Sequence, residues 1–415
     1  MWPIRIALIS DVHAGPLART TDLDPTSEPK IRDVGYLASF SKMLRDRKIE
    51  ADYLVLAGDL TSAAAVSEFN AAYASIDNIR KWLNVTKRKT IVVPGNHDVN
   101  WDVLKIGTNA DKDTWKRARY VPMTGDATRK LPRITAGAKG SLVDPPYFCH
   151  WSDGRTIIFG YNSAWHDGPD GKPHHGMFDT DHKPAIESEL AKLGAPDDRL
   201  RMFVVHHHPL QYSDPVPHKP DFSAMTNANA LLALLNRHRF DVMIHGHKHV
   251  PNMNFLTMNQ VWPLVVVGAG SFSAELPNDW GGLVSNQFHL LTVVDRATGT
   301  GSVRGTVKSW AYLAGHGWVP SGAANGAPHE WSFGSKITKD DAIALLVKHA
   351  SGPIDKTGYW DCSSYVASDL ELQYFPSHVM IEVVDAACAT LGISRAGNLS
   401  TNDCVLYRRA AGAKA

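Results

Sequence analysis

The sequence IVVPGNHDVN, residues Ile91–Asn100, is the stretch from which the fold can be inferred. It begins with apolar, mostly β-branched residues, which are typical of a buried strand. A Pro-Gly pair ends this run, and Asn96, His97 and Asp98 follow it on a loop. Parallel sheets bind their ligands at the carboxyl ends of their strands. The stretch therefore predicts a functional loop at the end of a buried strand.

Four other apolar runs end in the same way, at carboxylate or imidazole groups. They are Ile4–Ser10 before Asp11 and His13, Tyr53–Ala57 before Gly58 and Asp59, Met202–Val205 before His206, His207 and His208, and Val242–Ile244 before His245, His247 and His249. Helical spacings of apolar residues over Val34–Arg47 and Ser67–Leu83 give the order strand, helix, strand, helix, strand. That order predicts an α/β fold that brings the five strand ends together.

The polar groups at these strand ends form a mixed set of oxygen and nitrogen donors. The candidate ligands are Asp11, His13, Asp59, Asn96, His207, His247 and His249. Such a set suits Mn, Fe, Co, Ni or Zn better than Ca or Mg, which prefer oxygen ligands. Seven ligands are too many for one ion, and a carboxylate such as that of Asp59 can bridge two. We therefore expect a two-metal centre that hydrolyses a phosphate ester with a bridging hydroxide.

The composition is that of an ordinary globular protein. Of 415 residues, 44% are hydrophobic and 20% are charged, and the formal net charge of +1 gives no overall attraction to nucleic acid or to an anionic membrane. No run approaches the ~20 apolar residues of a membrane span, and we expect no targeting segment before the first strand. The chain has four scattered cysteines, Cys149, Cys362, Cys388 and Cys404. Because they form no CxxC pair, they favour a reducing cytoplasm.

The motifs divide the chain into a catalytic domain, residues 1–310, and a smaller appendage. An insertion at about 101–146 carries basic residues; we expect a solvated segment, with a phosphate-facing flap as the alternative. Three later runs predict strands of a second, antiparallel sheet: Val261–Ala269, Phe288–Asp295 and Gly301–Trp310.

Residues 311–334 are rich in Gly, Ala and Pro and predict a linker. Residues 335–415 predict a small α+β appendage with helices over Lys339–His349 and His378–Leu391, the first capped by Thr338 and the second ended by Gly392. No chemical motif is evident there, and we expect this appendage to mediate homo-oligomerisation or partner binding.

Taken in order, the five loops resemble those of the calcineurin-like metallophosphoesterase superfamily. The matching blocks are DVH, GD, GNHD, HHP and GHKH, which span Asp11 to His249. Together with the strands that follow, the resemblance covers about three quarters of the chain. It implies a four-layer α/β/β/α sandwich of two mixed sheets flanked by helices. HHP, GHKH and the sequence FGYNSAW are most similar to the branch of cyclic-nucleotide phosphodiesterases and glycerophosphodiesterases.

The resemblance also implies individual roles. One metal would be bound by Asp11, His13, Asp59 and His249, and the other by Asp59, Asn96, His207 and His247. His97 would contact the phosphate and protonate the leaving alcohol, and Asp98 would orient His97. Of the three consecutive histidines, the register favours His207 as the ligand, with His206 as its main competitor and His208 as a supporting donor.

The sequence thus predicts a dinuclear metal-dependent phosphodiesterase whose partner is a small phosphodiester such as a cyclic nucleotide. A nuclease or phosphomonoesterase with the same centre is the alternative. The near-zero net charge argues against a nuclease. Three basic stretches favour it: Lys87–Lys89, Lys112–Arg119 and Arg129–Arg133. A non-catalytic binding scaffold is disfavoured, because all seven ligands and His97 are present.

Overall fold

The computed structural model describes residues 2–24, 35–100, 139–140, 148–167, 174–194, 197–216, 223–258, 262–296, 301–397 and 404–408. The chain forms two compact units. The first comprises Met1, Pro3–Leu291 and Lys308–His329, and the second comprises Trp2, Thr292–Val307 and Glu330–Ala415. Most of the insertion expected at 101–146 lies outside the described residues.

The first sheet carries three of the predicted strand ends. Its strands follow the order β13 (Gly317–Pro320), β12 (Val303–Leu313), β11 (Gln287–Arg296), β1 (Ile4–Ile9), β2 (Tyr53–Ala57) and β3 (Thr90–Val93). β1, β2 and β3 are parallel, with Ile6 opposite Tyr53 and Leu54 opposite Thr90. Every residue of β2 and β3 is buried, which explains their uninterrupted apolar sequences.

The second sheet carries the two histidine-rich strand ends. Its order is β4 (Lys139–Gly140), β5 (Phe148–Ser152), β6 (Thr156–Tyr161), β7 (Leu200–Val204), β8 (Val242–His245), β10 (Trp262–Gly268) and β9 (Asn252–Met258). β6, β7, β8 and β10 are parallel neighbours, whereas β5 and β9 are antiparallel to theirs. The sheet is therefore mixed.

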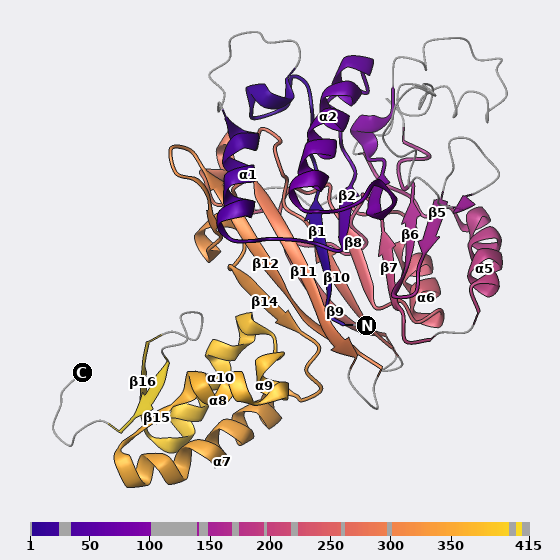
Figure 1. The fold of residues 1–415 in the computed structure, drawn as a ribbon. Helices are drawn as coiled ribbons and strands as arrows, with labels where there is room; N and C mark the ends of the chain where they lie inside the picture. The colour runs from indigo at the N-terminus through magenta and orange to yellow at the C-terminus, as the bar shows by residue number, and fades with distance from the viewer. Residues whose placement is uncertain are drawn as a thin grey trace. The chain divides into compact units, whose positions relative to one another are not determined.

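Helices flank both sheets (Figure 1). α1 (Tyr36–Asp46) and α2 (Val66–Trp82) share a buried apolar cluster with the first sheet, and α5 (Lys183–Lys192) and α6 (Ala228–Arg237) share one with the second. The four layers implied by the resemblance are confirmed. The five functional loops extend from strands of the two inner layers.

Two details differ from the sequence-based expectations. The strands predicted over Phe288–Asp295 and Gly301–Trp310 exist as β11 and β12, but they join the first sheet beside β1, and β10 alone joins the second. Alternating hydrophobicity identifies a strand but does not specify its neighbour. In place of a linker, residues 311–334 hold β13 and β14 (Glu330–Phe333), and their glycines and prolines lie mainly in the turns.

The second unit is a small α+β structure, as its sequence predicts. It contains α7 (Lys339–Thr357), α8 (Cys362–Ser368), α9 (Leu370–Gln373), α10 (Ser377–Leu391) and a sheet of the order β15 (Tyr359–Asp361), β17 (Val405–Tyr407) and β16 (Ser394–Ala396). The Thr338 side chain caps α7 by accepting a hydrogen bond from Asp341 N, and α10 ends at Gly392 in the left-handed conformation.

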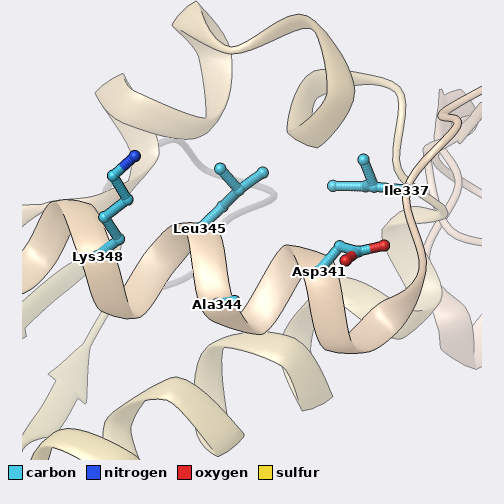
Figure 2. A pocket seen from close by; sticks show the side chains of 5 residues that line it. All are labelled: Ile337, Asp341, Ala344, Leu345 and Lys348. Atoms are coloured by element: carbon cyan, nitrogen blue, oxygen red, sulfur yellow. The ribbon is translucent and has the colours of Figure 1, made fainter.

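One side of α7 borders a pocket of about 340 Å³ (Figure 2). It is lined by Ile337, Asp341, Ala344, Leu345 and Lys348. The pocket contains no group of the strand-end motifs. Among the described residues, no helix has both the length and the apolar character needed to cross a bilayer.

Candidate metal centre

Backbone hydrogen bonds hold the loops of the site against one another. The loop after β1 donates from Asp11 N to Gly58 O (3.1 Å) and from His13 N to Asp59 O (3.0 Å). In the second sheet, Gly246 N donates to His206 O at 2.9 Å. The backbone thus fixes the positions from which the polar side chains project.

These side chains converge in space. Four overlapping groups have potential ligand atoms within 4.8 Å of one another: Asp11–His13–His249, His13–Asp59–His97, Asp11–Asp59–His206 and His206–His207–His247. Asn96 Oδ1 lies 3.2 Å from His206 Nε2. Because the groups share members, the structure brings all seven predicted ligands together with His97 and His206 in one cluster.

The backbone is strained at five of these residues. Asp11, His13, Asp59, His247 and His249 have φ angles between 49° and 78°, and they make up half of the ten non-glycine residues with positive φ that the structure describes. The left-handed conformation costs a non-glycine residue roughly 1–2 kcal/mol. Such strain concentrates where function requires it, so it marks the cluster independently of residue type.

Gly95 lets the loop after β3 approach Asp59. A Cβ atom at position 95 would lie 2.1 Å from Asp59 Oδ1 and 2.5 Å from Asp59 N. His97 N donates to the same Oδ1 atom at 2.9 Å. A side chain at position 95 would therefore displace the carboxylate expected to bridge the metals.

Several buried atoms of the cluster have no hydrogen-bond partner among the described residues. They include Asp11 Oδ1, His13 Nε2 and His207 Nε2. Asp11 Oδ1 lies 3.4 Å from His249 Nε2 and 4.0 Å from His13 Nε2, distances compatible with ligands of one ion. An unsatisfied buried polar atom costs about 1–3 kcal/mol. The residues therefore fit a metal site, since metal ions would satisfy these atoms.

Burial sets the charge of three imidazoles in the cluster. It lowers the pKa of His13 to about 3 and holds the pKa values of His207 and His247 well below 6.5, so these side chains are neutral, the form that binds metal. Burial acts to raise the pKa of Asp59, but the neighbouring His206 and His97 hold it well below its usual value. Burial acts to lower the pKa of His206, but the carboxylates of Asp59 and Asp11 raise it to about 9. The Asp59 carboxylate therefore faces one cationic imidazole and several neutral ones.

His97 and Asp98 are each held by contacts with the loop after β2. His97 Nδ1 lies 2.8 Å from the carbonyl oxygen of Ser62, which can only accept, so Nδ1 carries the proton and Nε2 has the lone pair in the neutral ring. The Asp98 carboxylate accepts from Gly95 N, Leu60 N and Thr61 N at 3.0–3.1 Å and from the Thr61 hydroxyl at 3.0 Å. Ser62 thus orients the imidazole, whereas Asp98 joins the loops after β2 and β3. Burial, followed by the charge of Asp59, raises the pKa of Asp98 to about 6.

Both candidate histidines after β7 reach the cluster. His206 Nε2 lies 3.2 Å from Asp59 Oδ2 and 3.3 Å from His247 Nδ1. His207 Nδ1 lies 2.7 Å from Ser163 Oγ. His208 stacks on His247, with ring centroids 5.7 Å apart. Ser163 is a contact that the motifs do not predict, although its position just after β6, in FGYNSAW, is the signal that could have identified it.

The four-layer fold and this cluster fit the class of metallophosphoesterases that the motifs resemble. A family model described as calcineurin-like phosphoesterase matches residues 4–251, more than half of the chain, and the chain belongs to this family. The membership implies a hydrolase that acts on phosphate esters and uses divalent metals. A comparison with curated protein sequences gives no match.

Three solved structures illustrate the similarity of fold. The purple acid phosphatase PPD1 of yellow lupin is 14% identical, covers 80% of this chain and 53% of its own, and has a TM-score of 0.48. The NAD nucleotidase of Haemophilus influenzae is 12% identical, and the match covers 77% of this chain and 54% of the nucleotidase, with a TM-score of 0.40. The calcineurin-like phosphoesterase YfkN of Bacillus subtilis is 13% identical, and the match covers 78% of this chain and 94% of YfkN, with a TM-score of 0.34. The chain spans about half the length of the first two proteins.

Proposed function

We propose that this chain is a dinuclear metal-dependent phosphodiesterase that hydrolyses a cyclic nucleotide or another small diester. The observation that supports it is the cluster of carboxylates, imidazoles and one carboxamide that the described residues form at five strand ends. The Asp59 carboxylate would contribute to both metal positions of such a two-metal centre.

The residues divide between two metal positions. Asp11, His13, Asp59 and His249 would bind one ion, and Asp59, Asn96, His207 and His247 the other. The nitrogen and oxygen donors suit Mn, Fe, Co, Ni or Zn. When bound, the two ions would supply an activated water near neutral pH and neutralise the charge of the phosphate.

His97 would hold the proton for the leaving group. Its Nδ1–H is bonded to the Ser62 carbonyl, and its ring belongs to the group with His13 and Asp59. A protonated Nε2 would therefore lie next to a phosphate bound at the metals and could donate to the departing alcohol oxygen. Asp98 would keep the loop of His97 in register with that of Asp59.

The preference for a small diester rests on the HHP, GHKH and FGYNSAW motifs, of which Ser163 contributes a direct contact to His207. A nuclease with the same centre is the second candidate, favoured by the basic stretches. Lys87–Lys89 forms a short 3₁₀ turn, η2, and the other two stretches lie outside the described residues. The net charge of +1 argues against a long polyanionic substrate.

We keep the cytoplasm as the proposed location, because no disulfide joins the four cysteines, all of which are described.

A substrate panel tests the proposal. Bis-p-nitrophenyl phosphate, p-nitrophenyl phosphate, cyclic AMP and single-stranded DNA would each be assayed with Mn, Fe, Ni and Zn. We expect the two small diesters to be hydrolysed with the highest kcat/KM, and the rates to change little with added salt. Preferential, strongly salt-dependent cleavage of DNA would instead support the nuclease, and preferential hydrolysis of the monoester would support a phosphatase.

A further inference from the structure

We propose that Cys362 and Cys404 form a reversible disulfide bond when the chain meets a low-molecular-weight disulfide such as oxidised glutathione. Both cysteines belong to the second unit, which contains none of the strand-end motifs. The inference therefore goes beyond the proposed function and does not depend on the metal centre. It assigns a modification site to the part of the chain in which the sequence shows no chemical motif.

The register of the small sheet places these two cysteines opposite one another. β15 and β17 are antiparallel, and Asp361 lies opposite Val405. The next opposing pair along the two strands is Cys362 and Cys404, and Cys362 N donates a hydrogen bond of 3.1 Å to Cys404 O. Hydrogen-bonded opposite residues in antiparallel strands have Cα atoms ~5.5 Å apart, and disulfides span roughly 4.4–6.8 Å between Cα atoms. The backbone therefore has the spacing that a disulfide requires.

The side chains of the pair are also in contact. Directly opposite residues of antiparallel strands project to the same face, and the two thiols form a side-chain hydrogen bond with each other. Ser363 holds Cys404 in place, since Ser363 N donates to Cys404 O at 3.2 Å and Cys404 N donates to the Ser363 hydroxyl at 2.8 Å. The two sulfur atoms thus need little movement to form a bond.

A third thiol lies close to the pair but is less suited to it. The interaction of Cys388, in α10, with Cys362 and Cys404 is electrostatic. Cys362 and Cys404 are joined instead by a thiol hydrogen bond and by their paired backbones. Cys149 lies in β5, in the first unit. We therefore expect Cys149 and Cys388 to remain thiols when the bond forms.

The fold keeps the thiols protonated while the second unit is closed. The hydrogen bond with Cys404, followed by burial, raises the pKa of Cys362, and burial raises the pKa of Cys388 to about 11. Since the thiolate is the form that attacks a disulfide, exchange is slow in this state. β15, β16 and β17 have three residues each, and such short strands open locally at a low cost in free energy. Oxidation should therefore follow the local opening of this sheet.

The reaction consists of two thiol–disulfide exchanges. The Cys404 thiolate attacks one sulfur of oxidised glutathione, which gives a mixed disulfide and releases one glutathione thiolate. The Cys362 thiolate then attacks the sulfur of Cys404 and releases the second. One S–S bond forms in the protein as that of glutathione breaks, and the two electrons and two protons lost by the cysteines reduce glutathione. An excess of reduced glutathione reverses both steps.

The bond would restrict a large part of the second unit. The chain between the two cysteines contains α9, α10 and β16. A cross-link stabilises a fold mainly because it restricts the unfolded chain, and its effect grows with the length of the closed segment. The oxidised unit should therefore open less often than the reduced one. In a reducing cytoplasm the pair persists as two thiols.

Disulfide mapping of the full chain tests the proposal. The reduced protein would be incubated with oxidised glutathione at a urea concentration below its unfolding transition, then alkylated, digested and analysed by mass spectrometry. We expect one cross-linked pair, Cys362 with Cys404, and alkylated Cys149 and Cys388. Cys404→Ser should abolish the cross-link. The matched control Cys388→Ser, which changes a buried cysteine of the same apolar cluster, should retain it.

Hydrogen exchange of the wild type gives a second measurement that needs no variant. The amide protons of β15 and β17 should exchange at least about 10-fold more slowly in the oxidised chain, and dithiothreitol should restore the faster exchange. Four alkylated cysteines, a bond between Cys388 and Cys404, a persistent mixed disulfide with glutathione, or unchanged exchange would overturn the inference. These outcomes leave the proposed function intact, whose failure would appear as a chain that binds no metal.

Discussion

The backbone N–H of His97 donates a hydrogen bond of 2.9 Å to Oδ1 of Asp59. The residue proposed as the acid is therefore tied to the residue proposed to bridge the metals. Because the contact comes from the backbone, it survives replacement of the His97 side chain. The acid and the metal centre can thus be tested separately.

Replacing His97 with Gln should lower kcat about 10²- to 10⁴-fold, the usual contribution of a positioned acid. The loss should be smaller for bis-p-nitrophenyl phosphate than for a diester with an alkyl leaving group, because p-nitrophenolate leaves without a proton. Steady-state assays on both substrates, with metal content measured in parallel, check this. An equal loss on both substrates would contradict the role of acid.

Replacing Gly95 with Ala should disrupt the centre, because the new Cβ would lie 2.1 Å from Asp59 Oδ1. We expect loss of at least one metal ion per chain and an activity reduction of about 100-fold, the size expected for a displacement near 1 Å. Gly154→Ala is the matched control, since a Cβ at Gly154 meets nothing within 4 Å. Metal content and activity equal to those of the control would show that the close approach is unimportant.

Asp98→Asn should destabilise the fold more than it affects the chemistry. The carboxylate accepts four hydrogen bonds, and an amide in its place offers one acceptor oxygen and an NH₂ group that faces donors. We expect unfolding to become easier by about 2–3 kcal/mol in urea. The control Asp46→Asn removes an exposed carboxylate paired with Lys42, and its stability should stay close to that of the wild type. An Asp98 variant as stable as this control would refute the loop-joining role.

His289 should make stability depend on pH. It is buried in β11, accepts a hydrogen bond from Gly270 N at 3.0 Å, and burial lowers its pKa to about 3. The contribution of the neutral His289 ring to the free energy of unfolding is complete above pH 6.5, the pKa of histidine in the unfolded chain. It is lost as the pH falls from 6.5 toward the pKa of about 3 in the folded chain, because only the unfolded chain then takes up the proton. Between pH 7 and pH 5 the loss is about 2 kcal/mol.

Urea unfolding of the wild type and His289→Gln at both pH values measures this dependence. The variant lacks the titrating group, so its stability should fall by about 2 kcal/mol less over the same interval. Identical pH dependence in the two proteins would mean that His289 is not kept neutral by the fold.

The strand-end loops could be predicted from the sequence because buried parallel strands have uninterrupted apolar sequences, and the first polar residues mark where each strand ends. Asp11, Asp59 and Asn96 follow such runs directly, and the structure brings them into one cluster. The choice between His206 and His207 could not be made, since it depends on where β7 ends and on the space that Gly58 leaves.

Other features depend on tertiary contacts that no local pattern specifies. The pairing of β11 with β1, rather than with the second sheet, is decided by long-range packing. The contact of Ser62 with His97 comes from a backbone carbonyl, which any residue type could provide. The left-handed conformations of His13 and His249 could not be predicted from the sequence either, because the loops impose the positive φ angles of these residues.

Metal stoichiometry combined with activity tests the central claim most directly. The purified full chain would be analysed for Mn, Fe, Co, Ni and Zn, stripped with a chelator, and reloaded, with hydrolysis of bis-p-nitrophenyl phosphate measured at each stage beside Asn96→Ala. The account predicts two ions per chain, loss of hydrolysis on stripping, recovery on reloading, and a loss of both metal and activity in Asn96→Ala. Fewer than one ion per chain, or hydrolysis that survives stripping, would contradict it.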